Sequence, residues 1–232
     1  MHVHLPKPLH GWREFAGEVG VIVLGVLIAL GAQKVLQDIQ LSGDITAFRG
    51  TIDQEIAANL YAYDVRVRQA DCVDKHLDQV DAWLARSRSG RTVSLRAGAP
   101  ASISLYRSAW DNRNAEIFNS LPDKFRAKYA EFYDELANNK QILEREREEW
   151  RVLGGFSEPG PLSLQDRRLI RNMLNRARGD AGSILGNASF SRKIASDLGI
   201  GEAAPEGTTT DDINRINQIV STCRPFVEDS PG

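Results

Sequence analysis

Two cysteines and a histidine are the residues of this sequence whose types and spacing could do chemistry. Cys72 and His76 are four residues apart, so a helix would place both side chains on one face, and Cys223 lies close to the C-terminus. An even number of cysteines in an oxidising compartment favours a disulfide, whereas in a reducing compartment two buried thiols are the alternative. In the chain-entropy model a Cys72–Cys223 bond contributes roughly 4–5 kcal/mol, because it closes a long loop.

The same helix face could offer a thiolate and an imidazole to zinc. Several carboxylates lie around this pair: Asp71, Asp74, Asp78 and Asp81. A zinc site needs three or four converging ligands, and the sequence displays only part of such a set. We therefore expect a disulfide beside a solvated acidic face, with neither a metal nor another cofactor.

Catalytic motifs are missing from the sequence. It contains no G-x-S-x-G, H-E-x-x-H, P-loop or Rossmann fingerprint. His76 is the only histidine after the N-terminal segment, so it is the only base that a nucleophilic triad could use. We expect a non-enzymatic protein without catalytic residues, and an enzyme that uses His76 is the less favoured alternative.

A cluster of arginines is the other chemical feature, and no acidic residue interrupts it. The cluster, called the arginine patch below, consists of Arg167, Arg168, Arg171, Arg176 and Arg178. It could bind anionic headgroups or an acidic protein partner, or it could complement the acidic run Glu144–Glu149 of the same chain. Nucleic acid is not an expected partner, because the net charge is −2 and the patch has no interleaved aromatic residues.

The elements that position these residues begin with an apolar N-terminal segment. Six of the first 40 residues are charged, against 54 of the remaining 192. As a helix, the 22 residues from Phe15 to Leu36 would span roughly 33 Å, which matches a hydrocarbon core of about 30 Å. We predict a transmembrane anchor that contacts the lipid bilayer through residues 15–36. A cleaved signal peptide and a buried core helix are the alternatives.

Charges on either side of the span predict its orientation. Lys7, Arg13 and the α-amino group precede it, whereas Lys34 and Arg49 follow, which favours a cytoplasmic N-terminus. The residues after the anchor would then lie in the periplasm of a bacterium. A face of small residues within the span would permit close helix pairing in a homodimer: Gly25, Ala29 and Ala32.

Downstream of the anchor, apolar residues recur every three or four positions, which is typical of amphipathic helices. This pattern predicts helices over residues 44–86, 104–120, 122–153 and 163–196, and a final helix from Thr209 to Pro225. The third of these has a near-heptad register with Asn139 and Glu146 at two of its inner positions.

The fold class predicted is all-α, with an N-terminal transmembrane helix followed by an antiparallel bundle of long amphipathic helices. The expected division is a short flank (1–14), the anchor helix (15–40), the helical bundle (41–226) and a disordered tail (227–232).

The segment LHGWREFAGEVGVIVLGVLIALGAQ (Leu9–Gln33) resembles the start of a family of uncharacterised single-span membrane proteins of proteobacteria. Members of that family carry a helical region after the anchor, with one cysteine in the first long helix and another near the C-terminus. The resemblance implies a single-pass protein of the bacterial inner membrane and assigns no catalytic residue. We expect a protein-interaction or scaffolding role at the cell envelope. A periplasmic ligand-sensing bundle that signals through a partner is the alternative.

Overall fold

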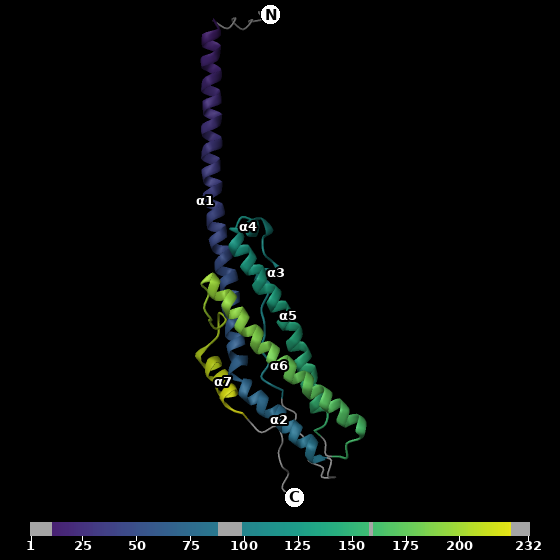
Figure 1. Ribbon diagram of the computed structural model, residues 1–232. Coiled ribbons are helices and arrows are strands. Elements are labelled where there is room, and N and C mark those ends of the chain that lie inside the picture. The colour runs from purple at the N-terminus through teal and green to yellow at the C-terminus, as the bar shows by residue number, and fades with distance from the viewer. Residues whose placement is uncertain (1–10, 88–98, 158–159, 224–232) are drawn as a thin grey trace, which may run out of the picture. The chain divides into compact units, whose positions relative to one another are not determined.

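The computed structural model describes residues 11–87, 99–157 and 160–223, and throughout this part the regular secondary structure is helical (Figure 1). The predicted tail 227–232 and most of the predicted flank 1–14 lie outside the described residues. The helices are α1 (Gly11–Arg68), α2 (Ala70–Arg86), α3 (Ser108–Asp111), α4 (Ala115–Asn119), α5 (Asp123–Gly154), α6 (Leu164–Leu198) and α7 (Thr210–Ser221).

The chain divides into two units by its internal contacts, Met1–Phe48 and Arg49–Gly232. In the described part of the first unit, α1 is long and apolar enough to cross a membrane, and its most apolar stretch has a mean hydropathy of 2.2. Large apolar side chains there are more than half exposed, among them Leu24, Leu27 and Ile28. No residue of this stretch is buried among the described residues, so its apolar surface is available to lipid.

The second unit is a bundle in which α6 packs against both α2 and α5. The helix α6 runs antiparallel to α5, because Lys128 pairs with Asp197 and Arg145 with Asp180. The part of α1 from Arg49 onward runs parallel to α5, because Asp53 pairs with Tyr129 and Arg66 with Glu146. The chain returns between these two parallel helices through residues 99–122 (Figure 1).

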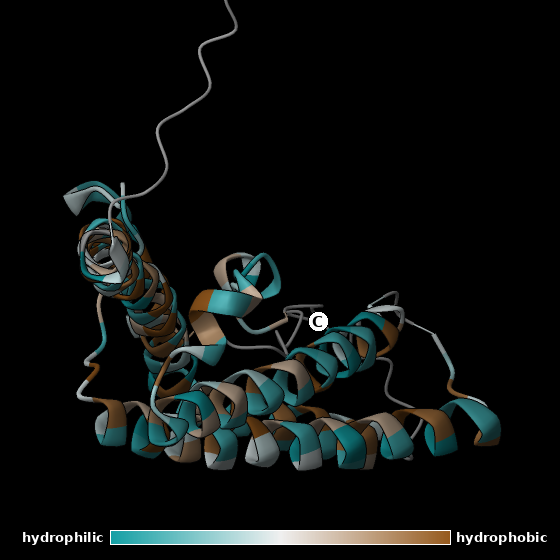
Figure 2. Cartoon of the chain, turned by 90° about the horizontal axis from the view of Figure 1, so that it is seen from above, coloured by the Kyte–Doolittle hydropathy of each residue, from teal (hydrophilic) through white to brown (hydrophobic). Residues whose placement is uncertain are grey.

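One apolar core cluster of this unit lies between α2, the end of α5 and the first half of α6, and further buried apolar residues, among them Ile52 and Phe132, lie on α1 and α5. Leu77 and Val80 of α2 are fully buried in the cluster, and Trp150, Leu153 and Ile170 complete the contact. Figure 2 shows hydrophobic and hydrophilic residues mixed along each of these helices, as expected for amphipathic helices that bury one face. Full burial of one leucine side chain contributes about 1.5–3 kcal/mol.

Polar side chains join α1 to α5. Asn139 is fully buried; its Nδ2 donates to Tyr63 Oη at 2.7 Å, and its Oδ1 accepts from Asn187 of α6 at 2.7 Å. Glu146 pairs with Arg66, and both side chains are buried. The two inner positions predicted from the heptad register are therefore buried and are filled by polar residues with specific partners.

The predicted helix over residues 104–120 is wrong, because the structure has an extended segment followed by the short helices α3 and α4. The Asn59 side chain donates to the Tyr106 carbonyl at 2.8 Å and accepts from the Tyr106 N–H at 2.7 Å. The Glu55 carboxylate accepts hydrogen bonds from the N–H groups of Ala109 and Trp110. Asn59 and Glu55 of α1 therefore bind backbone N–H and C=O groups that would be hydrogen-bonded within the helix if it extended over residues 104–120.

The predicted helix over residues 44–86 is interrupted at Gln69, which separates α1 from α2. The Gln69 N–H donates to the Arg66 carbonyl at 3.2 Å, a tighter turn than that of an α-helix. The two helix starts predicted further along the chain agree with the structure. The Ser163 and Thr209 side chains each accept a hydrogen bond from the backbone N–H three residues later, and the side chains of Asp166 and Asp212 accept from the backbone N–H of Ser163 and Thr209 in return.

Candidate functional site: a disulfide with a histidine, and a groove beside α7

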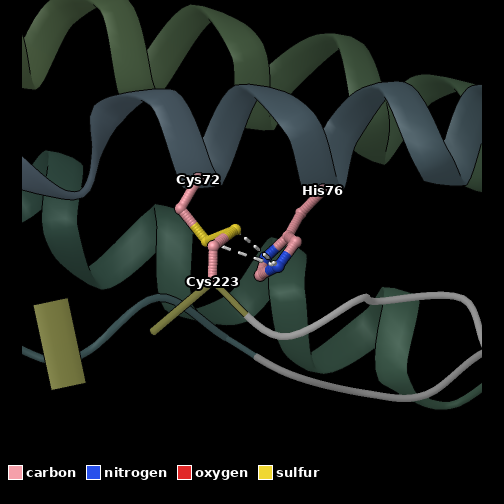
Figure 3. Close-up of a disulfide and its surroundings, with 3 residues drawn as sticks. All are labelled: Cys72, His76 and Cys223. Atoms are coloured by element: carbon pink, nitrogen blue, oxygen red, sulfur yellow. Dashed lines mark hydrogen bonds between the residues drawn. A yellow bond between two sulfur atoms is a disulfide. The ribbon is translucent and has the colours of Figure 1, made fainter. Parts of the chain in front are cut away.

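A disulfide joins Cys72 of α2 to Cys223, which lies just after the end of α7 (Figure 3). The two residues are 151 positions apart in sequence, and their Cα atoms are 5.5 Å apart. This is the pairing that the sequence favours. It links the segment just after α7 covalently to the first turn of α2.

His76 projects from the same face of α2 as Cys72, one turn further along, as Figure 3 shows. Its Nε2 atom lies 3.5 Å from Cys72 Sγ and 3.7 Å from Cys223 Sγ. The imidazole ring also meets the Trp150 ring edge-on, with 6.4 Å between the ring centroids. His76 therefore packs between the disulfide and the apolar core.

The sulfur and nitrogen atoms of Cys72, His76 and Cys223 lie within 4.8 Å of one another, a spacing that could suit a metal ion. Zinc is bound by thiolate rather than by the sulfur of a disulfide. With the disulfide closed, Cys72 and Cys223 form a covalent link and the His76 imidazole lies beside it. Metal binding would first require reduction of the disulfide to two thiols.

The arginine patch is only partly available to a partner. Arg167 donates to the Ser87 hydroxyl and carbonyl at 3.0 and 2.7 Å, and Arg178 pairs with Asp78 at 2.8 Å. Arg176 pairs with Glu149 at 3.0 Å, and the remaining two members, Arg168 and Arg171, are exposed. Three of the five arginines thus connect α6 to neighbouring helices. Only the pair with Glu149 corresponds to the predicted complementarity with the acidic run.

Burial and charge compete at the Glu149 carboxylate. Burial raises the pKa of Glu149, nearby Asp180 raises it further, and the Arg176 guanidinium opposes both. The Arg176–Glu149 pair is therefore a structural contact whose acidic partner is almost fully buried.

A groove of about 520 Å³ lies beside α7 and was not predicted from the sequence. Its walls are α1, the extended segment 101–106, the loop 205–208 and one face of α7. The apolar residues Ile216, Ile219 and Val220 of α7 line the groove, and no residue of α7 is fully buried. The spacing of Ile216 and Val220 is that of one helix face, and nothing in such a pattern distinguishes a core-facing stripe from a groove wall.

Gln69, at the break between α1 and α2, also lines the groove. The residue is 5% exposed, and among the described residues neither its Oε1 nor its Nε2 has a hydrogen-bond partner. Buried polar side-chain atoms normally have a partner, so this amide is an exception that calls for a physical reason.

Hydrogen bonds between described residues join α7 and the loop before it to α1, in addition to the disulfide. Arg68 Nη1 donates to Asn217 Oδ1 at 2.8 Å, and in the loop before α7 the Ala203 N–H donates to the Ala57 carbonyl at 3.2 Å. The Cys72–Cys223 bond then fixes the other end of the helix. The disulfide and the groove are therefore connected, because the disulfide holds the α7 wall of the groove in place.

Comparison of the chain with protein-family models, with curated proteins and with solved structures finds no match in any of the three.

Proposed function

We propose that this chain is a single-pass protein of the bacterial inner membrane, whose helical unit is a non-enzymatic protein-interaction or scaffolding module in the periplasm. The observation that carries the proposal is the exposed apolar stretch of α1, where Leu27 and Ile28 are 60% and 63% exposed. Exposure of so much contiguous apolar surface to water is unfavourable, whereas a bilayer would cover it.

The disulfide supports the periplasmic placement of the helical unit. Disulfides persist in oxidising compartments such as the periplasm and are rare in the cytosol. The charges that flank the span favour the same orientation, with Lys7 and Arg13 on the cytoplasmic side. The resemblance of Leu9–Gln33 to the family of single-span membrane proteins agrees with this topology.

An interaction role is supported by the surface of the helical unit. The groove beside α7 is lined by the apolar side chains Ile216, Ile219 and Val220, and interfaces commonly have an apolar centre with a polar rim. The exposed Arg168 and Arg171 could add contacts to an acidic partner.

Thiol labelling in intact cells tests the topology. Bacteria expressing the chain are treated with a membrane-impermeant maleimide, with and without prior exposure to an impermeant phosphine reductant. The proposal expects labelling of intact cells only after reduction. The variant with both Cys72→Ser and Cys223→Ser is the matched control and should not label under either condition. Labelling that needs cell lysis but no reductant would place two free thiols in the cytoplasm and overturn the periplasmic assignment.

A further inference from the structure

The cluster of Cys72, His76 and Cys223 has the spacing of a metal site once its two sulfurs are no longer bonded to each other. In a tetrahedral zinc site with Zn–S bonds of about 2.3 Å and Zn–N bonds of about 2.0–2.1 Å, each sulfur lies about 3.6 Å from the nitrogen. His76 Nε2 lies 3.5 Å from Cys72 Sγ and 3.7 Å from Cys223 Sγ (Figure 3). The imidazole nitrogen is therefore at the right separation from both sulfurs, and only the sulfurs have to move apart.

Two of the three ligands are held in place without the disulfide. Cys72 and His76 are four residues apart on α2, and this is the spacing at which one face of a helix presents two ligands to zinc. The same helix is fixed by Val73, Leu77 and Val80, which are buried in the apolar core cluster. Reduction of the disulfide should therefore leave Cys72 and His76 in their present positions.

Cys223 is the ligand that can move. It is exposed and lies just after α7, none of whose residues is fully buried. A small displacement of this segment gives the two sulfurs the separation of two ligands on one metal ion. Because Cys223 is exposed, a reductant can also reach the disulfide.

We propose that the reduced chain binds one zinc ion through the Cys72 and Cys223 thiolates and His76 Nε2. Thiolate and imidazole are ligands that suit zinc. Among the described residues the cluster offers three ligands, which leaves the fourth position of a tetrahedral site to water. The inference goes beyond the proposed interaction role and does not depend on it. A disulfide joins α7 to α2 in the oxidised chain, and zinc joins them in the reduced chain.

The change from disulfide to zinc site takes place in two balanced steps. A dithiol reductant breaks the Cys72–Cys223 bond, supplies each cysteine sulfur with a hydrogen and leaves as its own disulfide. Zinc then binds both sulfurs as thiolates, and each thiol releases its proton to water. His76 contributes the lone pair of Nε2, so its proton is on Nδ1. The charge of the zinc ion does not change.

Cobalt(II) is the probe for this site, because a thiolate bound to it gives a charge-transfer band in the near ultraviolet. The full chain in lipid nanodiscs is reduced with a phosphine in the absence of oxygen, freed of metal with a chelator that is then removed, and titrated with cobalt. The reduced chain should bind one cobalt ion with the band of two thiolates, and zinc should displace it. The oxidised chain should show no such band.

Variants of the histidines test the third ligand. His76→Gln should weaken metal binding by at least about 10–100-fold, the effect of losing even an outer-shell partner of a metal ligand. His76→Cys should restore binding with a stronger band, since it supplies a third thiolate. The matched control replaces His2, His4 and His10 with glutamine, which are all the other histidines of the chain, and should leave affinity and band unchanged. Circular dichroism checks that each variant keeps its helical content.

Hydrogen exchange provides a second measurement. In the reduced, metal-free chain the amide groups of α7 should lose protection, and zinc should restore it, because the metal joins Cys223 to α2 again. The inference is overturned by a reduced chain without the cobalt band, by unchanged affinity in His76→Gln, or by bound zinc that leaves α7 unprotected. Loss of binding in the control variant would assign the metal to the N-terminal histidines and would overturn it equally.

Discussion

Arg66 of α1 and Glu146 of α5 form an ion pair inside the helical unit, where their residues are 1% and 4% exposed. Burial raises the pKa of the Glu146 carboxyl, and the Arg66 guanidinium opposes that shift. Charged partners so far from water are stable only together, because an unpaired charge in this position would be poorly solvated.

Removal of either partner alone should therefore be strongly destabilising. We expect Arg66→Met and Glu146→Leu each to lower the free energy of unfolding by about 3–5 kcal/mol. The double variant should recover most of this loss, since two apolar side chains of similar volume leave no uncompensated charge. Chemical denaturation of the four chains, followed by circular dichroism, measures the coupling. Additive losses in the double variant would contradict this prediction.

Three buried tyrosines predict a loss of stability in alkali. Burial, together with the hydrogen bond to Asp53, raises the pKa of Tyr129 to about 12, and burial also raises the pKa values of Tyr63 and Tyr133 above their ordinary range. A folded-state pKa above the unfolded value of 10.0 gives stability that is fully present below pH 10. Tyr129 should therefore contribute a loss of stability as the pH rises from 10 to about 12.

Absorbance at 295 nm measures the ionisation of tyrosine directly. Tyr129→Phe should remove the step near pH 12 while the chain remains folded. A wild-type titration in which every tyrosine ionises near pH 10 without unfolding would contradict the burial of these hydroxyl groups.

Loss of the disulfide should release α7 before it affects the rest of the unit. No residue of α7 is fully buried, whereas α5 and α6 contribute many residues to the core. In Cys223→Ser we expect the amide groups of α7 to lose hydrogen-exchange protection while those of α5 and α6 keep it. The free energy of global unfolding should fall by less than the roughly 4–5 kcal/mol of the chain-entropy model.

Reduction of the wild-type protein is the matching experiment and should reproduce the exchange pattern of Cys223→Ser. Equal loss of protection in α5, α6 and α7 would mean that the unit unfolds cooperatively when the bond is broken, contrary to this prediction.

A charge at the centre of the membrane span should impair insertion. Leu27→Arg is expected to cost about 2.5–3.5 kcal/mol on translocon-insertion scales. Val35→Arg is the matched control, because position 35 lies beside Lys34 near the end of the span, where a long basic side chain can reach the headgroups. Retention of the two variants in alkali-washed membranes compares them, and equal retention would argue against the predicted span.

Local interactions explain what could be predicted from the sequence. The capping boxes at Ser163 and Thr209 each join residues three positions apart, so the starts of α6 and α7 are visible in the sequence. The stripe of α5 likewise repeats over its whole length and identifies Asn139 and Glu146 as inner positions.

Contacts between distant residues explain what could not be predicted. The segment before α3 is extended because Asn59, 47 positions earlier, binds the backbone of Tyr106. The groove beside α7 is formed by segments that are far apart in sequence, since α1, residues 101–106 and α7 all line it. The break between α1 and α2 at Gln69 is also not visible in the sequence, because no glycine or proline marks it. Periodicity indicates that a helix has an apolar face but gives no information about what that face will contact.

The distance in sequence between the two cysteines also sets an order of events during synthesis. Cys223 follows Cys72 by 151 residues, so at about 5–20 residues per second the first thiol waits on the order of 8–30 s for its partner. The chain has only two cysteines, so during that interval Cys72 has no wrong partner within its own chain. Closure of the bond therefore requires that synthesis has passed α7 and reached Cys223, so the closed disulfide reports that α7 is present.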